Sequence, residues 1–361
     1  TSRRYFTIPM VVSGINGLVV IFFVVFGHKS LGIPSVLWGN ITGFSLALIL
    51  QIYILRKLVK WTFLHIGTHF RKLVWRNLSF SNLGYAATIF SSFLPIYLLS
   101  DYADGYITSL TFGLRIAEIP NSMITMQLAS VFSIRFSELY AKAQLQDMNE
   151  VFLRSARLLT FLLIPVSMIG FTLSHEISSI VFGQGVLDEA SLNIISDFLK
   201  ILILACPFIG INIITSRVLM ATQKIRPSFY YQIASNIVLS LMILASIHIL
   251  GPIGYAYGYT SFYILNFITL FFFLKKFSGS VQYKKLFPSL FHIYIVNIPL
   301  IIVPSIASYF LGIQSSYINL VFITTVYLLL LVLSNKTLKL NPDIHTFLDG
   351  IKKGIFKTRA P

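Results

Sequence analysis

Apolar runs of about 20 residues recur from one end of this sequence to the other, and they constrain its fold more than any other feature. A helix of about that length crosses the roughly 30 Å hydrocarbon core of a bilayer. The chain is 56% apolar and only 11% charged, whereas a soluble domain carries about 25% charged residues. Ten-residue segments of alternating polarity, typical of a membrane β-barrel, are absent from the sequence. The sequence therefore predicts an all-α polytopic membrane protein.

The apolar runs divide into ten predicted transmembrane helices. They cover residues 6–27, 31–55, 77–100, 106–134, 153–173, 191–219, 227–249, 252–274, 288–311 and 316–334. The fourth and sixth exceed the length that a bilayer core needs, so we expect them to tilt or to project beyond it.

Basic residues predict the orientation of these helices. The net charge of +16 is concentrated in alternate connections and in the last 26 residues, whereas Lys29 is the only basic residue of the opposite connections. Cytoplasmic loops of membrane proteins are enriched in Lys and Arg, so both termini are predicted to be cytoplasmic. This alternation explains the charge by topology and gives no reason to expect a nucleic-acid partner.

The spans and connections predict five segments. Residues 1–55 form a two-helix piece, and residues 56–76 form a basic amphipathic linker on the cytoplasmic side. A six-helix unit at 77–277, two further helices at 286–335 and an amphipathic cytoplasmic tail at 340–361 follow. The linker and the tail interleave basic and apolar residues, which is typical of helices that lie on an anionic membrane surface. An ordinary amphipathic linker remains the alternative for residues 56–76.

Arg115 and Glu118 are charged residues inside the fourth predicted span. A charge at the centre of a bilayer costs roughly 2.5–3.5 kcal/mol on insertion scales, so it is retained mainly where it faces protein or water. Their spacing places both side chains on one helix face, and Pro120 predicts a kink just beyond them. We interpret this face as the lining of a polar passage; the alternative is that Arg115 and Glu118 pair with each other and only hold helices together.

Other polar residues inside the spans are further candidates for substrate binding. Asn82 and Gln127 are suited either to hydrogen bonds between helices or to substrate contact. Lys200 either binds substrate or extends its ammonium group to the outer interface. The remaining polar span residues, for which hydrogen bonding between helices is the default interpretation, are Asn16, Asn40, Gln51, Asn212, Asn236 and Asn266.

The sequence carries no pattern of a catalytic or metal centre. An HExxH, a CxxC, a P-loop and a GxSxG are all missing. His65 and His69 have ligand spacing but no evident third ligand, and the single cysteine, Cys206, excludes an internal disulfide. We therefore predict a transporter rather than an enzyme, with no catalytic residue, metal or cofactor.

Three segments in this order resemble the MurJ/MviN lipid II flippases of the multidrug/oligosaccharidyl-lipid/polysaccharide exporter superfamily. They are Arg115-Ile116-Ala117-Glu118-Ile119-Pro120, then Ile164-Pro165, then Val181-Phe182-Gly183-Gln184-Gly185. The resemblance covers about residues 77–275 and, more loosely, 6–55. It implies fourteen helices, arranged as two six-helix lobes plus two, around a cationic cavity for a lipid's diphosphate and sugar. The ten spans here would be the last ten, without the first four helices of the family.

The resemblance implies a function and a set of partners. The chain would flip a polyprenyl-diphosphate-linked saccharide, foremost lipid II, from the inner to the outer leaflet of the bacterial inner membrane. Arg115 and Glu118 match cavity positions of the family, and the last two spans match helices that hold the polyprenyl tail. The implied partners are this lipid, membrane lipids and cell-wall synthesis proteins.

Departures from the family pattern keep other functions open. Ile134-Arg135 replaces a Leu-Pro, and the inner loop Gln223-Lys224-Ile225-Arg226-Pro227 lacks the usual acid. Another lipid-linked oligosaccharide, of O-antigen or exopolysaccharide, is therefore the main alternative substrate. A multidrug exporter is disfavoured by the scarcity of intramembrane carboxylates, and a glycan-assembly enzyme by the short outer loops. A non-transporting scaffold is the fourth alternative.

Overall fold

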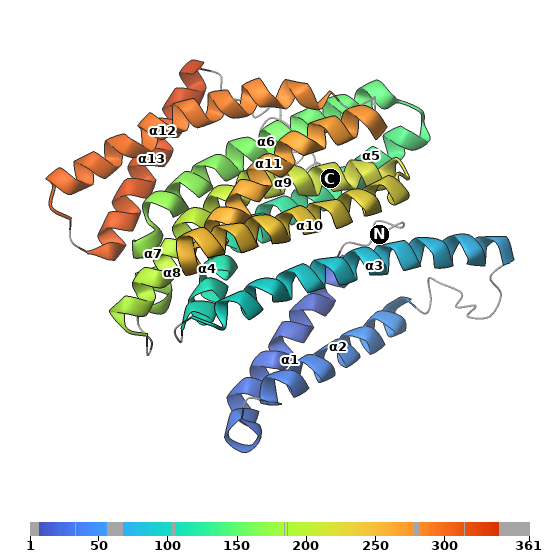
Figure 1. The fold of residues 1–361 in the computed structure, drawn as a ribbon, viewed down its shortest axis with the longest axis horizontal. Helices are drawn as coiled ribbons and strands as arrows, with labels where there is room; N and C mark the ends of the chain where they lie inside the picture. Colours follow the sequence, from blue (N-terminus) through green and yellow to red (C-terminus); the bar gives the residue numbers. More distant parts are fainter. Residues whose placement is uncertain are drawn as a thin grey trace, which may run out of the picture. The chain divides into compact units, whose positions relative to one another are not determined.

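The computed structural model describes residues 7–338 except 33, 56–67, 103–104, 184, 186, 278–281 and 314. Within these residues every regular element is a helix (Figure 1), which confirms the predicted all-α class. The described residues of the ten predicted spans lie mostly in helices. The predicted tail at 340–361 and residues 56–67 of the linker lie outside the described residues, and residues 68–76 begin a helix.

The chain forms two compact units, Thr1–Trp75 and Arg76–Pro361. In the first, α1 (Thr7–Leu31) packs against α2 (Pro34–Leu55). Gly39 allows this approach, because a Cβ atom there would lie only 3.0 Å from the Cα atom of Val20. A Cβ atom at Gly43 would likewise collide with the side chain of Asn16. The Gly39–Gly43 pair therefore forms a close helix contact of the small-residue type.

Helix α3 (Thr68–Leu99) begins in the first unit, and most of its residues belong to the second. The second unit also contains all later helices. In chain order they are α4 (Tyr106–Pro120), η1 (Asn121–Thr125), α5 (Met126–Ala141), α6 (Leu145–Thr172), α7 (Ser174–Phe182), α8 (Glu189–Leu202), η2 (Ile203–Ala205), α9 (Cys206–Ala221), α10 (Ile225–Leu250), η3 (Gly251–Ile253), α11 (Gly254–Phe277), η4 (Tyr283–Lys285), α12 (Leu286–Phe310) and α13 (Ser316–Leu338).

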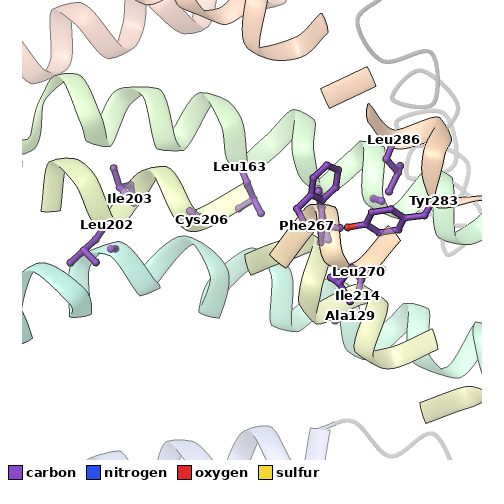
Figure 2. Packing of buried hydrophobic residues seen from close by; sticks show 14 of the residues in the cluster. Ala129, Leu163, Leu202, Ile203, Cys206, Ile214, Phe267, Leu270, Tyr283 and Leu286 are labelled. Atoms are coloured by element: carbon purple, nitrogen blue, oxygen red, sulfur yellow. The ribbon is translucent and has the colours of Figure 1, made fainter. Parts of the chain in front are cut away.

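Helix α6 forms the centre of this unit. It packs against α5, α9 and α12, and its Phe152, Leu159 and Leu163 are fully buried. Figure 2 shows Leu163 and Cys206 within this core, and Tyr283 beside Phe267 at one end of it. The outward faces of α10, α12 and α13 expose many large apolar side chains, as helices in contact with lipid do.

Seven helical stretches of the described residues have the length and apolar character to cross a membrane. Two of them contain two helices each: Glu189–Ala221 includes α8 and α9, and Arg226–Lys276 includes α10 and α11. The charged segment at 106–134 is not among the seven, and the apolar part of α1 is shorter than the others. The chain is thus a multi-pass membrane protein, while the count of ten spans and the five-segment division stay predictions.

Two elements differ from the prediction. Helix α7 occupies part of the predicted outer connection, because its Ser174 and Ser178 are buried against neighbouring helices. Helix α6 begins at Leu145 rather than near 153, because Met148 and Phe152 in its added turns are buried in the core. Its first turn also carries Asp147, a favourable charge at a helix N-terminus.

A substitution at Gly258 can test the close packing of α10 on α11. A Cβ atom there would lie 2.8 Å from the carbonyl oxygen of Met242 and 2.9 Å from the Cα atom of Ile243. We expect Gly258→Val to lower the free energy of unfolding by about 1–3 kcal/mol, the usual cost of overpacking. Thermal denaturation in detergent measures this loss. Gly17→Val is the control, because a Cβ atom at Gly17 meets nothing within 4 Å; equal melting temperatures for both variants would contradict the prediction.

Candidate functional site

Helix α4 presents one buried and one exposed face. Leu110, Gly113 and Ala117 are buried on the side that packs against α8. At Gly113 a Cβ atom would lie 3.0 Å from the Cβ atom of Phe198, so the two helices approach closely. The periodicity of the helix leaves Arg115 and Glu118 on the exposed side.

Arg115 and Glu118 share that exposed side without forming an ion pair with each other. An ion pair between described residues does occur on the later helix α5, where Arg135 Nη1 lies 3.4 Å from Glu138 Oε2. The predicted alternative, in which Arg115 and Glu118 neutralise each other, is therefore not the arrangement of this structure. The guanidinium group of Arg115 keeps its donors available for an anion.

Helix α11 carries a row of three tyrosines, Tyr255, Tyr259 and Tyr263. These residues recur every four positions, and the ring centroids are 5.8 Å apart for Tyr255 and Tyr259 and 4.8 Å apart for Tyr259 and Tyr263. The three rings therefore form a continuous aromatic row along α11.

A π-helical turn, η1, follows Pro120 where the sequence predicted a kink. Buried Asn121 donates hydrogen bonds to the carbonyl oxygen of Cys206 at 3.2 Å and to its Sγ atom at 3.3 Å. Thr125 donates to Asn121 Oδ1 at 2.8 Å. A π turn inserts an extra residue into a helix and often occurs at functional sites. Here it shifts the exposed face of α5 relative to that of α4.

A cavity of about 630 Å³ lies between α3, α9, α10 and α11. Its amide side chains are Asn212, Gln232, Asn236 and Asn266. Tyrosine, serine and threonine hydroxyl groups supply the other polar atoms, and none of the described residues that line it is charged. Tyr263, the last residue of the tyrosine row, belongs to this lining.

Hydrogen bonds order the wall of this cavity. Gln232 Nε2 and Asn236 Nδ2 of α10 both donate to Thr88 Oγ1 of α3, at 3.1 and 3.2 Å. Between α10 and α11, the hydroxyl group of Tyr231 donates to Asn266 Oδ1 at 2.7 Å. Polar contacts of this kind hold membrane helices together, and they place the amide groups at defined positions.

Comparison with known proteins identifies the family. The sequence model described as "Lipid II flippase MurJ" matches residues 1–334, which is most of the chain.

The chain belongs to the MurJ lipid II flippase family.

Structural comparison agrees with this assignment. The chain is similar to a solved structure described as "Lipid II flippase MurJ, inward closed conformation", with a TM-score of 0.69 and 18% sequence identity. The alignment covers 94% of this chain and 69% of the other chain. At this identity the likeness establishes the fold. A search of curated proteins finds no match.

The MurJ-like site residues predicted from sequence lie on four helices of the second unit. Arg115 and Glu118 are on α4, Asn82 is on α3, Gln127 is on α5 and Lys200 is on α8, and all five are exposed. None of these five lines the cavity. Lys200 Nζ lies 5.4 Å from the centre of the Phe171 ring, a cation–π contact. The role of the five predicted site residues in substrate binding stays a prediction.

The cavity contains residues whose spacing predicts other roles or no role. Hydrogen bonding between helices is the prediction for Asn212, Asn236 and Asn266, and Asn236 and Asn266 form such bonds. Gln232 and Tyr231 were not singled out, although Gln232 precedes Asn236 by four residues and shares its helix face. This four-residue spacing is the sequence signal that identifies Gln232 as a partner of Asn236.

The described part of the chain contains no group of three potential metal ligands. Of the His65–His69 pair, His65 lies outside the described residues.

Asn121 provides a test of the π turn. We expect Asn121→Leu to lower the free energy of unfolding by about 1–3 kcal/mol, because Thr125 and the Cys206 carbonyl lose a buried partner. Thermal denaturation of the purified protein measures the change. Asn193→Leu, at an exposed position of α8, is the matched control. Equal melting temperatures for the two variants would show that Asn121 does not stabilise η1.

Proposed function

We propose that this chain acts in the flipping of lipid II from the inner to the outer leaflet of the bacterial inner membrane. The observation that carries the proposal is the family match over residues 1–334. In lipid II, a polyprenyl diphosphate carries a saccharide, so the headgroup combines negative charge with neutral sugar. The headgroup crosses through a polar passage while the tail stays in lipid, by alternating access. No covalent bond is made or broken, so the proposed function needs no catalytic residue.

Arg115 is the residue that we assign to the diphosphate. Its side chain is exposed on α4 and forms no ion pair with Glu118, so its planar donors are available to phosphate oxygens. Glu118 is exposed on the same side of α4, and its carboxylate can accept hydrogen bonds from sugar hydroxyl groups. We assign Glu118 to contact with the sugar. Asn82, Gln127 and Lys200 are proposed as further contacts along the passage.

The orientation with both termini in the cytoplasm and the contact with cell-wall synthesis proteins belong to the same proposal. The main competing substrate is another lipid-linked oligosaccharide. The neutral lining of the cavity supports this alternative, because amide and hydroxyl groups do not distinguish lipid II from other saccharides by charge.

The proposal predicts a specific loss for Arg115 variants. We expect Arg115→Ala in the intact protein to slow lipid II translocation by about tenfold or more, because a charge-assisted hydrogen bond contributes roughly 1.5–3 kcal/mol. Arg115→Lys should retain part of the rate, since it keeps the charge but loses the bidentate geometry. An assay of headgroup accessibility at the outer leaflet measures both rates.

Arg135→Ala is the control for that experiment, because Arg135 is an exposed arginine that pairs with Glu138. Undiminished translocation by Arg115→Ala would remove Arg115 from the mechanism. Translocation of an O-antigen or exopolysaccharide lipid in preference to lipid II would replace the substrate but keep the transport class.

A further inference from the structure

We propose that the cavity between α3, α9, α10 and α11 binds the neutral sugar part of the transported lipid headgroup, separately from the diphosphate. The inference rests on the proposed flippase function and names the part of the substrate that this cavity takes. It follows from the chemistry of the cavity lining and from the hydrogen bonds that hold its wall.

The lining matches a neutral, polyhydroxylated ligand. Amide groups and hydroxyl groups offer both donors and acceptors, and sugar hydroxyl groups need both. No described lining residue is charged, so the cavity gives a diphosphate no opposite charge to offset its desolvation. Phe229, Phe262 and Tyr263 add aromatic surface on which the apolar face of a sugar ring can pack. The volume of about 630 Å³ falls within the range of roughly 300–1,000 Å³ found for small-molecule sites.

The hydrogen bonds of the wall leave polar atoms for a ligand. Thr88 Oγ1 takes one donor each from Gln232 and Asn236. An amide side chain has two N–H groups and a carbonyl oxygen, so each of these two residues retains ligand-binding capacity. Asn266 accepts from Tyr231 through Oδ1, and its Nδ2 group is a further donor. The wall is thus positioned by its own bonds before a ligand enters, which lowers the entropic cost of binding.

Tyr263 belongs both to the lining of the cavity and to the tyrosine row of α11. Arg115 is one helical turn from Glu118 on the same exposed side of α4, and neither residue lines the cavity. A headgroup held by Arg115 through its diphosphate and by the cavity through its sugar would thus place its charged and neutral parts on different surfaces.

Cysteine protection tests occupancy of the cavity directly. Ser235→Cys places a thiol in the lining, while the native Cys206 is buried. The intact protein is treated with a water-soluble methanethiosulfonate, with and without N,N′-diacetylchitobiose as a neutral amino-sugar probe. We expect the probe at saturation to slow labelling by about fivefold or more, whereas inorganic diphosphate should not. Ser137→Cys, at an exposed position of α5, is the control and should be unaffected by either compound.

Binding of two lipids provides the second measurement. Asn266→Leu and Gln232→Leu should each weaken binding of lipid II by about tenfold, because sugar hydroxyl groups lose a partner, and should leave binding of sugar-free undecaprenyl diphosphate unchanged. Asn193→Leu should alter neither affinity. Equal loss for both lipids, no loss for either, or protection by diphosphate as strong as by the sugar would overturn the proposal. Sugar protection without any lipid translocation would refute the flippase function and leave the sugar site standing.

Discussion

Polar groups inside a membrane need partners within the protein, and this requirement organises the second unit. Water is scarce in the bilayer core, so an unsatisfied polar group there costs several kcal/mol. Asn121 meets the requirement by bonding α9 from the π turn, and Thr88 by accepting from two residues of α10. Near the start of α13, Asn319 donates to Glu176 of α7 at 2.6 Å, and in the middle of α13 Tyr327 donates to Asn297 of α12. Each of these bonds joins two helices. Apolar contacts alone would not fix their positions, because lipid tails are as apolar as leucine and give no hydrophobic driving force for helix association.

The polar residues that are not used in this way mark the proposed transport surfaces. Arg115 and Glu118 are exposed together on α4, and the amides of the cavity retain donors and acceptors beyond those that hold its wall. The exposed face of α4 carries two charged side chains, whereas the described lining of the cavity is neutral. A lipid whose headgroup joins a diphosphate to a saccharide presents the same two kinds of surface. Membership in the MurJ family and this division of polar residues support the same class of substrate.

Sequence reasoning predicted the helical spans and the charged face of α4, and it missed features that depend on contacts between helices. Hydropathy identifies a span because it sums over about 20 residues. Hydropathy did not predict α7, because the burial of its serines depends on the neighbouring helices that pack against it. Pro120 indicated a disturbance of the helix, but its form as a π turn follows from the bonds of Asn121 to Cys206, 85 residues away. The cavity was missed for the same reason, since its residues come from four separate helices.

The sequence by itself determined that this chain is a helical membrane protein with an arginine and a glutamate on one helix face, and its motifs indicated the MurJ family. Both properties are local, because they depend on composition and on spacing along single helices. The tertiary structure decided which polar side chains pair with each other and which remain available to a ligand. Arg115 and Glu118 have the spacing of an ion pair but do not form one, whereas Gln232 and Thr88, 144 residues apart, do meet. Spacing along a helix makes a contact possible, but the competition among neighbouring helices for each polar group selects the contact that forms.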